Sequence, residues 1–196
     1  VDFIFAHHPM IFRPAKNLDL SVPQNKMYAD LIKHDIVVYA AHTNLDAAAG
    51  GMNDWLAEAL QLTDVAPLIP NADGKTGLGR IGSLTTPQTV TDYAIFVRDL
   101  FNVAHVRVIA NDMNRSIQRI AVLGGDGGSE YPDALAAGAD AYVTADFYYH
   151  TAHDVLADDF VVIDPDHHME AIAKDRLVDL VKTWQTENGW QLTDVF

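Results

Sequence analysis

The chain contains no cysteine among its 196 residues. Disulfides, iron–sulfur clusters and zinc fingers are therefore excluded, and nitrogen and oxygen atoms must hold any bound metal. Positive charge is also scarce, because 13 Lys and Arg residues stand against 27 Asp and Glu residues, for a formal net charge of −14. This balance argues against broad binding of nucleic-acid phosphates, which requires a basic surface.

Long apolar runs are absent as well. None approaches the roughly 20 residues of a membrane span, and the first residues lack the charged-then-apolar order of a signal segment. We therefore expect a cytoplasmic protein that does not associate with membranes. The apolar segment 1–6 has the character of a buried strand at the very start of the chain, so we expect further residues to precede Val1 in the complete protein.

The order of apolar segments predicts an α/β fold with a parallel or mixed sheet, because strand patterns alternate with helical patterns. The predicted strands cover residues 1–6, 36–41, 106–109, 117–123, 140–145 and 160–163. The predicted helices cover residues 26–34, 89–101, 131–138, 147–157 and 169–184, with one more after a cap at Asn53 or Asp54. Residues 63–80 are rich in Pro, Gly and Asp and are the best candidate for a domain boundary. A faint repeat of strand followed by histidine or aspartate suggests two similar lobes, although common strand patterns explain it equally well.

Two glycine-rich segments could be mistaken for phosphate-binding loops. Residues 77–82 match a G-x-G-x-x-G pattern, but a loop precedes them and no helix follows, so we predict a turn entering a strand. Residues 124–128 could form a phosphate-cradling nest. They lack the Lys-Ser/Thr ending of a nucleotide-binding loop, and a flexible turn is the favoured interpretation.

Seven of the nine histidines fall in four clusters, each at the end of an apolar run. The clusters are His7 with His8, His42 with Asp46, His150 with His153, and His167 with His168 and Glu170. Histidine and carboxylate are the usual ligands of zinc, manganese and iron(II). In α/β proteins, bound molecules and ions gather at the carboxyl ends of the strands. The four clusters together therefore predict a metal site with more than one ion. Each cluster alone has an incidental explanation.

Spacing refines this prediction. His7 and His8 are adjacent in an extended segment, so we expect their side chains to point in opposite directions. The two histidines would then bind two neighbouring ions, or one would bind an ion while the other contacts one of its ligands. His167 and Glu170 are three apart at a helix start and share a face. A glutamate there can bridge two ions, which together would activate water for hydrolysis.

Several short stretches occur in the order found in the NGG-one-interacting-factor-three-like proteins, also called GTP cyclohydrolase I type 2 homologues. They are Ala6-His7-His8-Pro9, His42-Thr43-Asn44-Leu45-Asp46, Gly50 to Asp54, Gly77 to Gly82, Val122 to Gly125, Ala139 to Asp146 with Tyr149-His150, and Ile163-Asp164 with His167 to Glu170. The chain resembles this family over essentially its whole length.

The resemblance implies two similar α/β lobes with a metal-binding cleft between them. The lobes would cover residues 1–72 and 73–196, with 160–196 returning ligands to the cleft. The implied ligands of two divalent ions (zinc, manganese or iron) are His7, His8, Asp46, His167 and Glu170, with Glu170 as the bridge and His42 nearby. The resemblance also implies a homohexameric ring.

Two positions depart from the family pattern. Ala145 stands where the family usually has glycine, so the local turn is expected to differ. Asp166 also replaces a usual glycine, which places another carboxylate beside the predicted ligands. Neither change removes a predicted ligand.

Our leading hypothesis is a metal-dependent hydrolase acting on a small-molecule substrate such as a nucleotide or phosphoester. His42, Asp146 and His150 are the candidates for proton transfer or substrate orientation. GTP cyclohydrolase activity follows from the family name alone. The alternative is a non-catalytic metal- or ligand-binding scaffold, sensor or chaperone, which would bind metal without turnover. If the histidines are incidental, the protein binds no stoichiometric metal.

Overall fold

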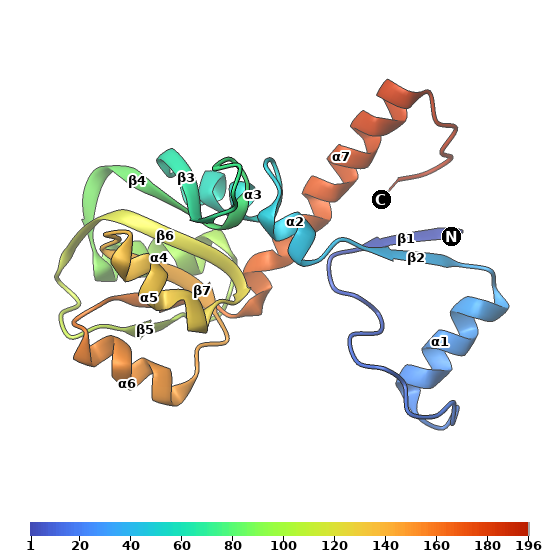
Figure 1. Cartoon of the computed structure of the whole chain (residues 1–196), viewed down its shortest axis with the longest axis horizontal. Helices are drawn as coiled ribbons and strands as arrows, with labels where there is room; N and C mark the ends of the chain where they lie inside the picture. The colour runs from blue at the N-terminus through green and yellow to red at the C-terminus, as the bar shows by residue number, and fades with distance from the viewer. Residues whose placement is uncertain (196) are drawn as a thin grey trace. The chain divides into compact units, whose positions relative to one another are not determined.

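The structure is a computed structural model that describes residues 1–195 (Figure 1). Helices and strands alternate along the chain, which confirms the predicted α/β class. By its internal contacts the chain divides into two compact units, Val1–Leu45 and a second unit that begins at Asp46. No helix within residues 1–195 is both long and apolar enough to cross a bilayer.

The first unit is a parallel strand pair joined by a helix. Strand β1 (Phe3–Ala6) leads through helix α1 (Pro23–Lys33) to strand β2 (Val37–Ala40). Helix α1 begins at a proline, whose fixed φ angle and missing N–H suit the first helical turn. The last residues of both strands are register partners, so the segments after the two strands emerge at one edge.

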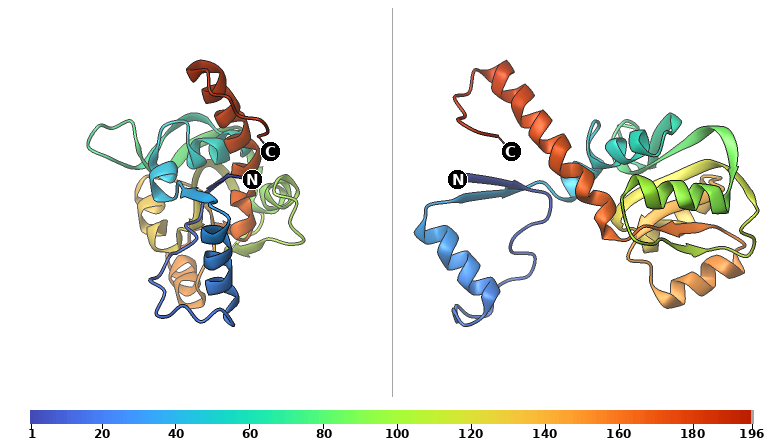
Figure 2. Two further views of the ribbon diagram at one scale, coloured as in Figure 1. Left: turned by 90° about the vertical axis from the view of Figure 1, so that its right-hand side faces the viewer. Right: turned by 180° about the vertical axis from the view of Figure 1, so that it is seen from behind.

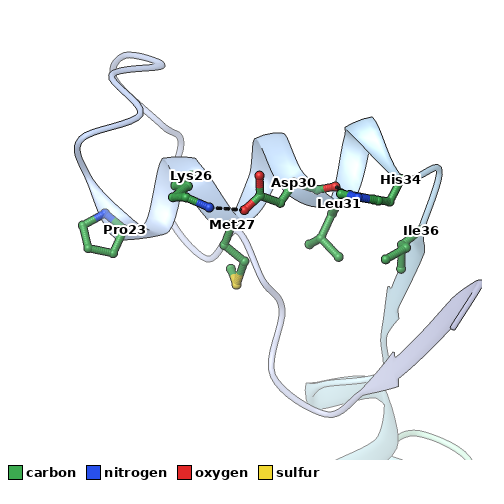
Figure 3. A pocket seen from close by; sticks show the side chains of 7 residues that line it. All are labelled: Pro23, Lys26, Met27, Asp30, Leu31, His34 and Ile36. Carbon is green, nitrogen blue, oxygen red and sulfur yellow. Dashed lines mark hydrogen bonds and ion pairs between the residues drawn. The ribbon is translucent and has the colours of Figure 1, made fainter.

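An open groove runs beside α1 in this unit (Figure 3). It is lined by Pro23, Lys26, Met27, Asp30, Leu31, His34 and Ile36. Lys26 forms an ion pair with Asp30 at 2.5 Å across one turn of the helix. None of the predicted site residues lines this groove, so the candidate site lies elsewhere.

The second unit is built on a six-stranded mixed sheet. Its strands are β3 (Thr63–Pro70), β4 (Gly77–Thr89), β5 (Arg107–Ile109), β6 (Ser116–Asp126), β7 (Ala141–Ala145) and β8 (Val162–Asp164). They lie in the order β3-β4-β6-β7-β8-β5, with β6, β7 and β8 mutually parallel and the other pairs antiparallel. The three parallel strands therefore end at the same edge of the sheet.

Helices cover both faces of this sheet (Figures 1 and 2). They are α3 (Met52–Ala59), α4 (Val90–Leu100), α5 (Tyr131–Ala136) and α6 (Tyr149–Ala157), with short 3-10 turns at Gly128–Glu130 and His167–Ile172. Helix α7 (Ala173–Asn188) follows the second of these turns and contacts it and α3. Ala134 of α5 and Val155 of α6 pack with Leu123 and Tyr142 in one buried cluster. Helix α4 lies on the opposite face (Figure 2, right). Every residue of β7 is buried, as expected for a central parallel strand.

The predicted boundary segment 63–80 is instead largely an antiparallel hairpin of β3 and β4. Its two prolines are tolerated because β3 is the edge strand, where one side of the backbone needs no partner. The turn predicted at residues 77–82 does enter a strand, β4. The expected lobe boundary at 72/73 falls in the hairpin turn inside the second unit. Residue 196, the end of the expected second lobe, lies outside the described residues.

We predict that Ile120→Ala lowers the free energy of unfolding by about 2–5 kcal/mol, because it leaves a cavity in the middle of β6. Ile120 is fully buried, whereas Ile95 on α4 is 45% exposed and provides the control. Ile95→Ala should cost less than about 1 kcal/mol. Urea unfolding of both variants measures the difference, and equal losses would contradict this assignment of the core.

Candidate metal centre

Three histidines converge where β1 and β2 end in the first unit. His7, His8 and His42 each offer a ring nitrogen, and these nitrogens lie within 4.8 Å of one another. The ring centroids of His7 and His8 are 4.9 Å apart. The expectation that these two side chains point in opposite directions is therefore wrong. Strand alternation does not reach them, because β1 ends at Ala6 and the chain bends at residues 7–8.

A backbone hydrogen bond fixes the orientation of His7. Its Nδ1 lies 2.7 Å from the carbonyl oxygen of Ala41. A carbonyl oxygen only accepts, so the ring donates from Nδ1 and, when neutral, carries its lone pair on Nε2. The backbone N–H of Ala41 in turn donates to the carbonyl of Ala6 at 3.0 Å, so the acceptor belongs to the paired strands. This is the arrangement expected of a metal-binding histidine.

The second unit places another set of donor atoms at the carboxyl edge of its parallel strands. His167 Nε2 lies 3.0 Å from Glu170 Oε2 within the 3-10 helix His167–Ile172. Side chains three apart eclipse in such a helix, which confirms that these two residues share a face. A carboxylate oxygen of Asp46 lies within 4.8 Å of one from Glu170. Both side chains are only 8% exposed, so two carboxyl groups are held close together with little water around them.

Asp146 orients the ring of His167. Its Oδ2 lies 2.6 Å from Nδ1 of His167, so an ionised Asp146 holds the ring proton on Nδ1 and directs Nε2 toward Glu170. Partial burial lowers the pKa of His167, but the hydrogen bond to Asp146 and the negative charges of Glu170 and Asp146 outweigh it. The pKa of His167 therefore lies above its ordinary value of 6.5.

Asn53 supports this set of residues, although the sequence suggested only a helix cap. Helix α3 is capped by Gly51 instead, and Asn53 is fully buried. Its Nδ2 donates to the carbonyl of Asp46 at 3.0 Å, and its Oδ1 accepts from the N–H of Gly124 at 3.0 Å. One amide thus ties the segment of Asp46 to the end of β6.

Arg80 is a second support that sequence reasoning did not assign to the site. Its side chain is 2% exposed and pairs with Asp54 through Nε and Nη2. It also donates to the carbonyl oxygens of Ala48, Gly77 and Gly79 at 2.8–2.9 Å. All five guanidinium donors are therefore used, and the loop before α3 is fastened to β4. The sequence feature that could have indicated this role is a single arginine that follows Gly79 in an otherwise apolar strand.

The glycines at the end of β6 make room for Glu170. A Cβ atom on Gly124 would lie 3.2 Å from Glu170 Oε1, and one on Gly125 would lie 2.8 Å from it. Gly125 also has a φ angle of +69°, which favours glycine. The sequence alone favours a flexible turn for residues 124–128. Gly124 and Gly125 instead belong to the end of β6, where the missing side chains leave space for the buried carboxylate of Glu170.

Two further histidines of the predicted clusters belong to neither of these sets. His150 is on α6, where its ring centroid is 5.4 Å from that of Tyr149. It belongs to none of the groups of converging donor atoms found among residues 1–195. His168 is exposed and lies 3.3 Å from Asp166. The roles in proton transfer or substrate orientation given to His42, Asp146 and His150 stay predictions.

The family model described as Duf34/NIF3 (NGG1p interacting factor 3) matches residues 1–196, which is the whole chain. The chain belongs to the Duf34/NIF3 family. A GTP cyclohydrolase 1 type 2 homolog of Streptococcus pneumoniae is 42% identical over 195 residues, covering 98% of this chain and 73% of that relative. The predicted family resemblance is confirmed.

Solved Duf34/NIF3 structures share the fold. A Bacillus cereus protein related to NIF3 superposes with a TM-score of 0.91 at 27% identity, covering 100% of this chain and 82% of the other. A hypothetical protein of Staphylococcus aureus gives a TM-score of 0.91 at 26% identity, covering 97% of this chain and 75% of the other.

The two positions at which the resemblance leads us to expect glycine have different backbone conformations. Ala145 keeps a negative φ as the buried last residue of β7, and the positive φ of the turn falls on Asp146 at +52°. Asp166 adopts φ +70° and ψ 162°, a region that is essentially restricted to glycine. The second replacement therefore stores backbone strain directly before His167.

We predict that Asp166→Gly raises the melting temperature by about 2–4 °C, because releasing backbone strain returns about 1 kcal/mol. The carboxylate of Asp166 is exposed, and its contacts, with the His168 ring at 3.3 Å and with the backbone N–H groups of His167 and His168, are open to solvent, so little is lost with it. Asp166→Ala is the matched control, since it removes the carboxylate but keeps Cβ. Differential scanning calorimetry that finds Asp166→Ala equally stabilising would show that the backbone is not strained.

Proposed function

We propose that this protein binds divalent metal and acts as a metal-dependent hydrolase on a nucleotide or phosphoester. The observation that carries the proposal is the orientation of the donor atoms. His7 and His167 each donate from Nδ1 to a fixed acceptor, which presents Nε2 as the metal-binding atom. The proposed ligands of two ions are His7, His8, Asp46, His167 and Glu170, as the family resemblance implies.

The donor set suits the proposed ions. Imidazole nitrogen and carboxylate oxygen are ligands of zinc, manganese and iron, and the cysteine-free sequence offers no thiolate. When both are ionised, the close carboxylates of Asp46 and Glu170 repel each other, and a cation between them would relieve this repulsion. Glu170, with an oxygen facing His167, is the proposed bridge.

The residues of the chain have separate tasks in this proposal. Two bound ions would polarise a phosphoryl or carbonyl oxygen and supply hydroxide at neutral pH. Asp146 holds the proton of His167 on Nδ1 and keeps Nε2 directed at Glu170. His42, whose ring centroid lies 5.2 Å from that of His7, is a candidate for transferring a proton or orienting the substrate. His150, on α6, has the same proposed role.

The same proposal includes a cytoplasmic location and assembly into a homohexameric ring. Charge argues against nucleic acid as a partner, since the formal net charge is −14. The hexamer rests on the family resemblance alone and stays a prediction.

We predict about two metal ions per chain in protein purified without tag or chelator, and a loss of that metal in His7→Ala/Glu170→Ala. His105→Ala/Glu187→Ala is the matched control, because it removes the same residue types at exposed positions outside the ligand sets. Elemental analysis gives the stoichiometry, and a screen of nucleotides and phosphoesters tests turnover. Metal without turnover would support the non-catalytic scaffold, and an absence of metal after reconstitution would overturn the proposal.

A further inference from the structure

Asp164, the last residue of β8, is a buried carboxylate to which the mechanism above assigns no role. It is 5% exposed and carries two oxygens that accept from different turns. Oδ2 accepts from the backbone N–H of Phe147 at 3.1 Å. Oδ1 accepts from the backbone N–H of Asp166 at 2.9 Å.

These two N–H groups are immediate neighbours of Asp146 and His167. Phe147 follows Asp146 in the turn after β7, and Asp166 precedes His167 in the turn after β8. The 2.6 Å contact between Asp146 and His167 therefore spans two turns that share one acceptor residue. Backbone conformation alone does not hold them, because Asp146 and Asp166 both have a positive φ. A strained turn persists only where surrounding contacts fix it.

Arg107 keeps the Asp164 carboxylate in place from the neighbouring strand. The two residues are register partners of β5 and β8 and form an ion pair. Nη2 of Arg107 also donates to the carbonyl of Phe147 at 2.6 Å, so a second hydrogen bond fixes the turn after β7. Arg107 is half exposed, so its charge is partly screened, and the buried carboxylate is the central element of the arrangement.

We infer that Asp164 is a positioning residue that holds the turns of Asp146 and His167 together and thereby sets which nitrogen of His167 faces the metal. The inference deepens the proposed function, since its value to the protein depends on metal binding at His167. It concerns hydrogen bonds that exist without metal, so it can be tested on the metal-free protein.

The test is Asp164→Asn, whose amide has one acceptor oxygen where the carboxylate has two. At least one of the two backbone N–H groups must lose its partner, which loosens the corresponding turn. Nitrogen-15 NMR of the metal-free protein, at a pH where the ring is neutral, should show His167 protonated mainly on Nδ1 in the unchanged chain, because the contact of Nδ1 with Asp146 at 2.6 Å is shorter than that of Nε2 with Glu170 at 3.0 Å. In Asp164→Asn we expect a mixture of both tautomers, and a fall in zinc affinity of about 10-fold by calorimetric titration.

Asp140→Ala is the control for general destabilisation. Oδ2 of Asp140 accepts two backbone hydrogen bonds outside the site, from Gln118 and Arg119 at 2.8 and 2.7 Å, and alanine removes this acceptor. Asp140→Ala should lower the melting temperature and leave both the His167 tautomer and zinc affinity unchanged. The same pattern in Asp164→Asn would overturn the inference.

Asp164→Glu covers the case in which Asp164→Asn does not fold. It keeps the charge beside Arg107 and displaces the carboxylate by one methylene, so a smaller change of the same kind is expected. An unchanged tautomer and zinc affinity in Asp164→Glu would count against the inference. Failure of the unchanged chain to bind zinc would overturn the proposed function instead, while the tautomer comparison would still decide the role of Asp164.

Discussion

The hydrogen bond between His167 and Asp146 is the interaction on which the account of this site depends. An imidazole has two nitrogens, and only one can present a lone pair once the other holds the proton. Asp146 accepts from Nδ1, so Nε2 is the nitrogen that faces Glu170. His7 follows the same rule in the first unit, with the carbonyl of Ala41 in place of the carboxylate.

Strand pairing explains why these acceptors are in place. Parallel strands end at one edge of a sheet, so the residues that follow them are brought together in both units. Buried polar side chains then fix the segments beyond the strand ends. Asn53, Arg80 and Asp164 each bind more than one backbone group, and each is at most 5% exposed. Such residues stabilise a structure only when all their polar atoms have partners, as those of Arg80 do.

The sequence predicted what depends on local pattern. Alternating strands and helices gave the α/β class, and clustered histidines and carboxylates marked the ends of strands. The edge strand Thr63–Pro70 was missed because its prolines resemble a loop until its place at the sheet edge is known. The directions of His7 and His8 were mistaken because alternation ends with β1. Asn53 and Arg80 could not be assigned, since their partners are distant in sequence and only the folded chain brings them together.

Anomalous X-ray diffraction from crystals of the zinc-loaded protein tests the central claim most directly. The account predicts an ion about 2.0–2.1 Å from Nε2 of His167, with Nδ1 still bonded to Asp146. An ion on Nδ1 of His167, or zinc bound only at sites away from His167 and Glu170, would contradict it.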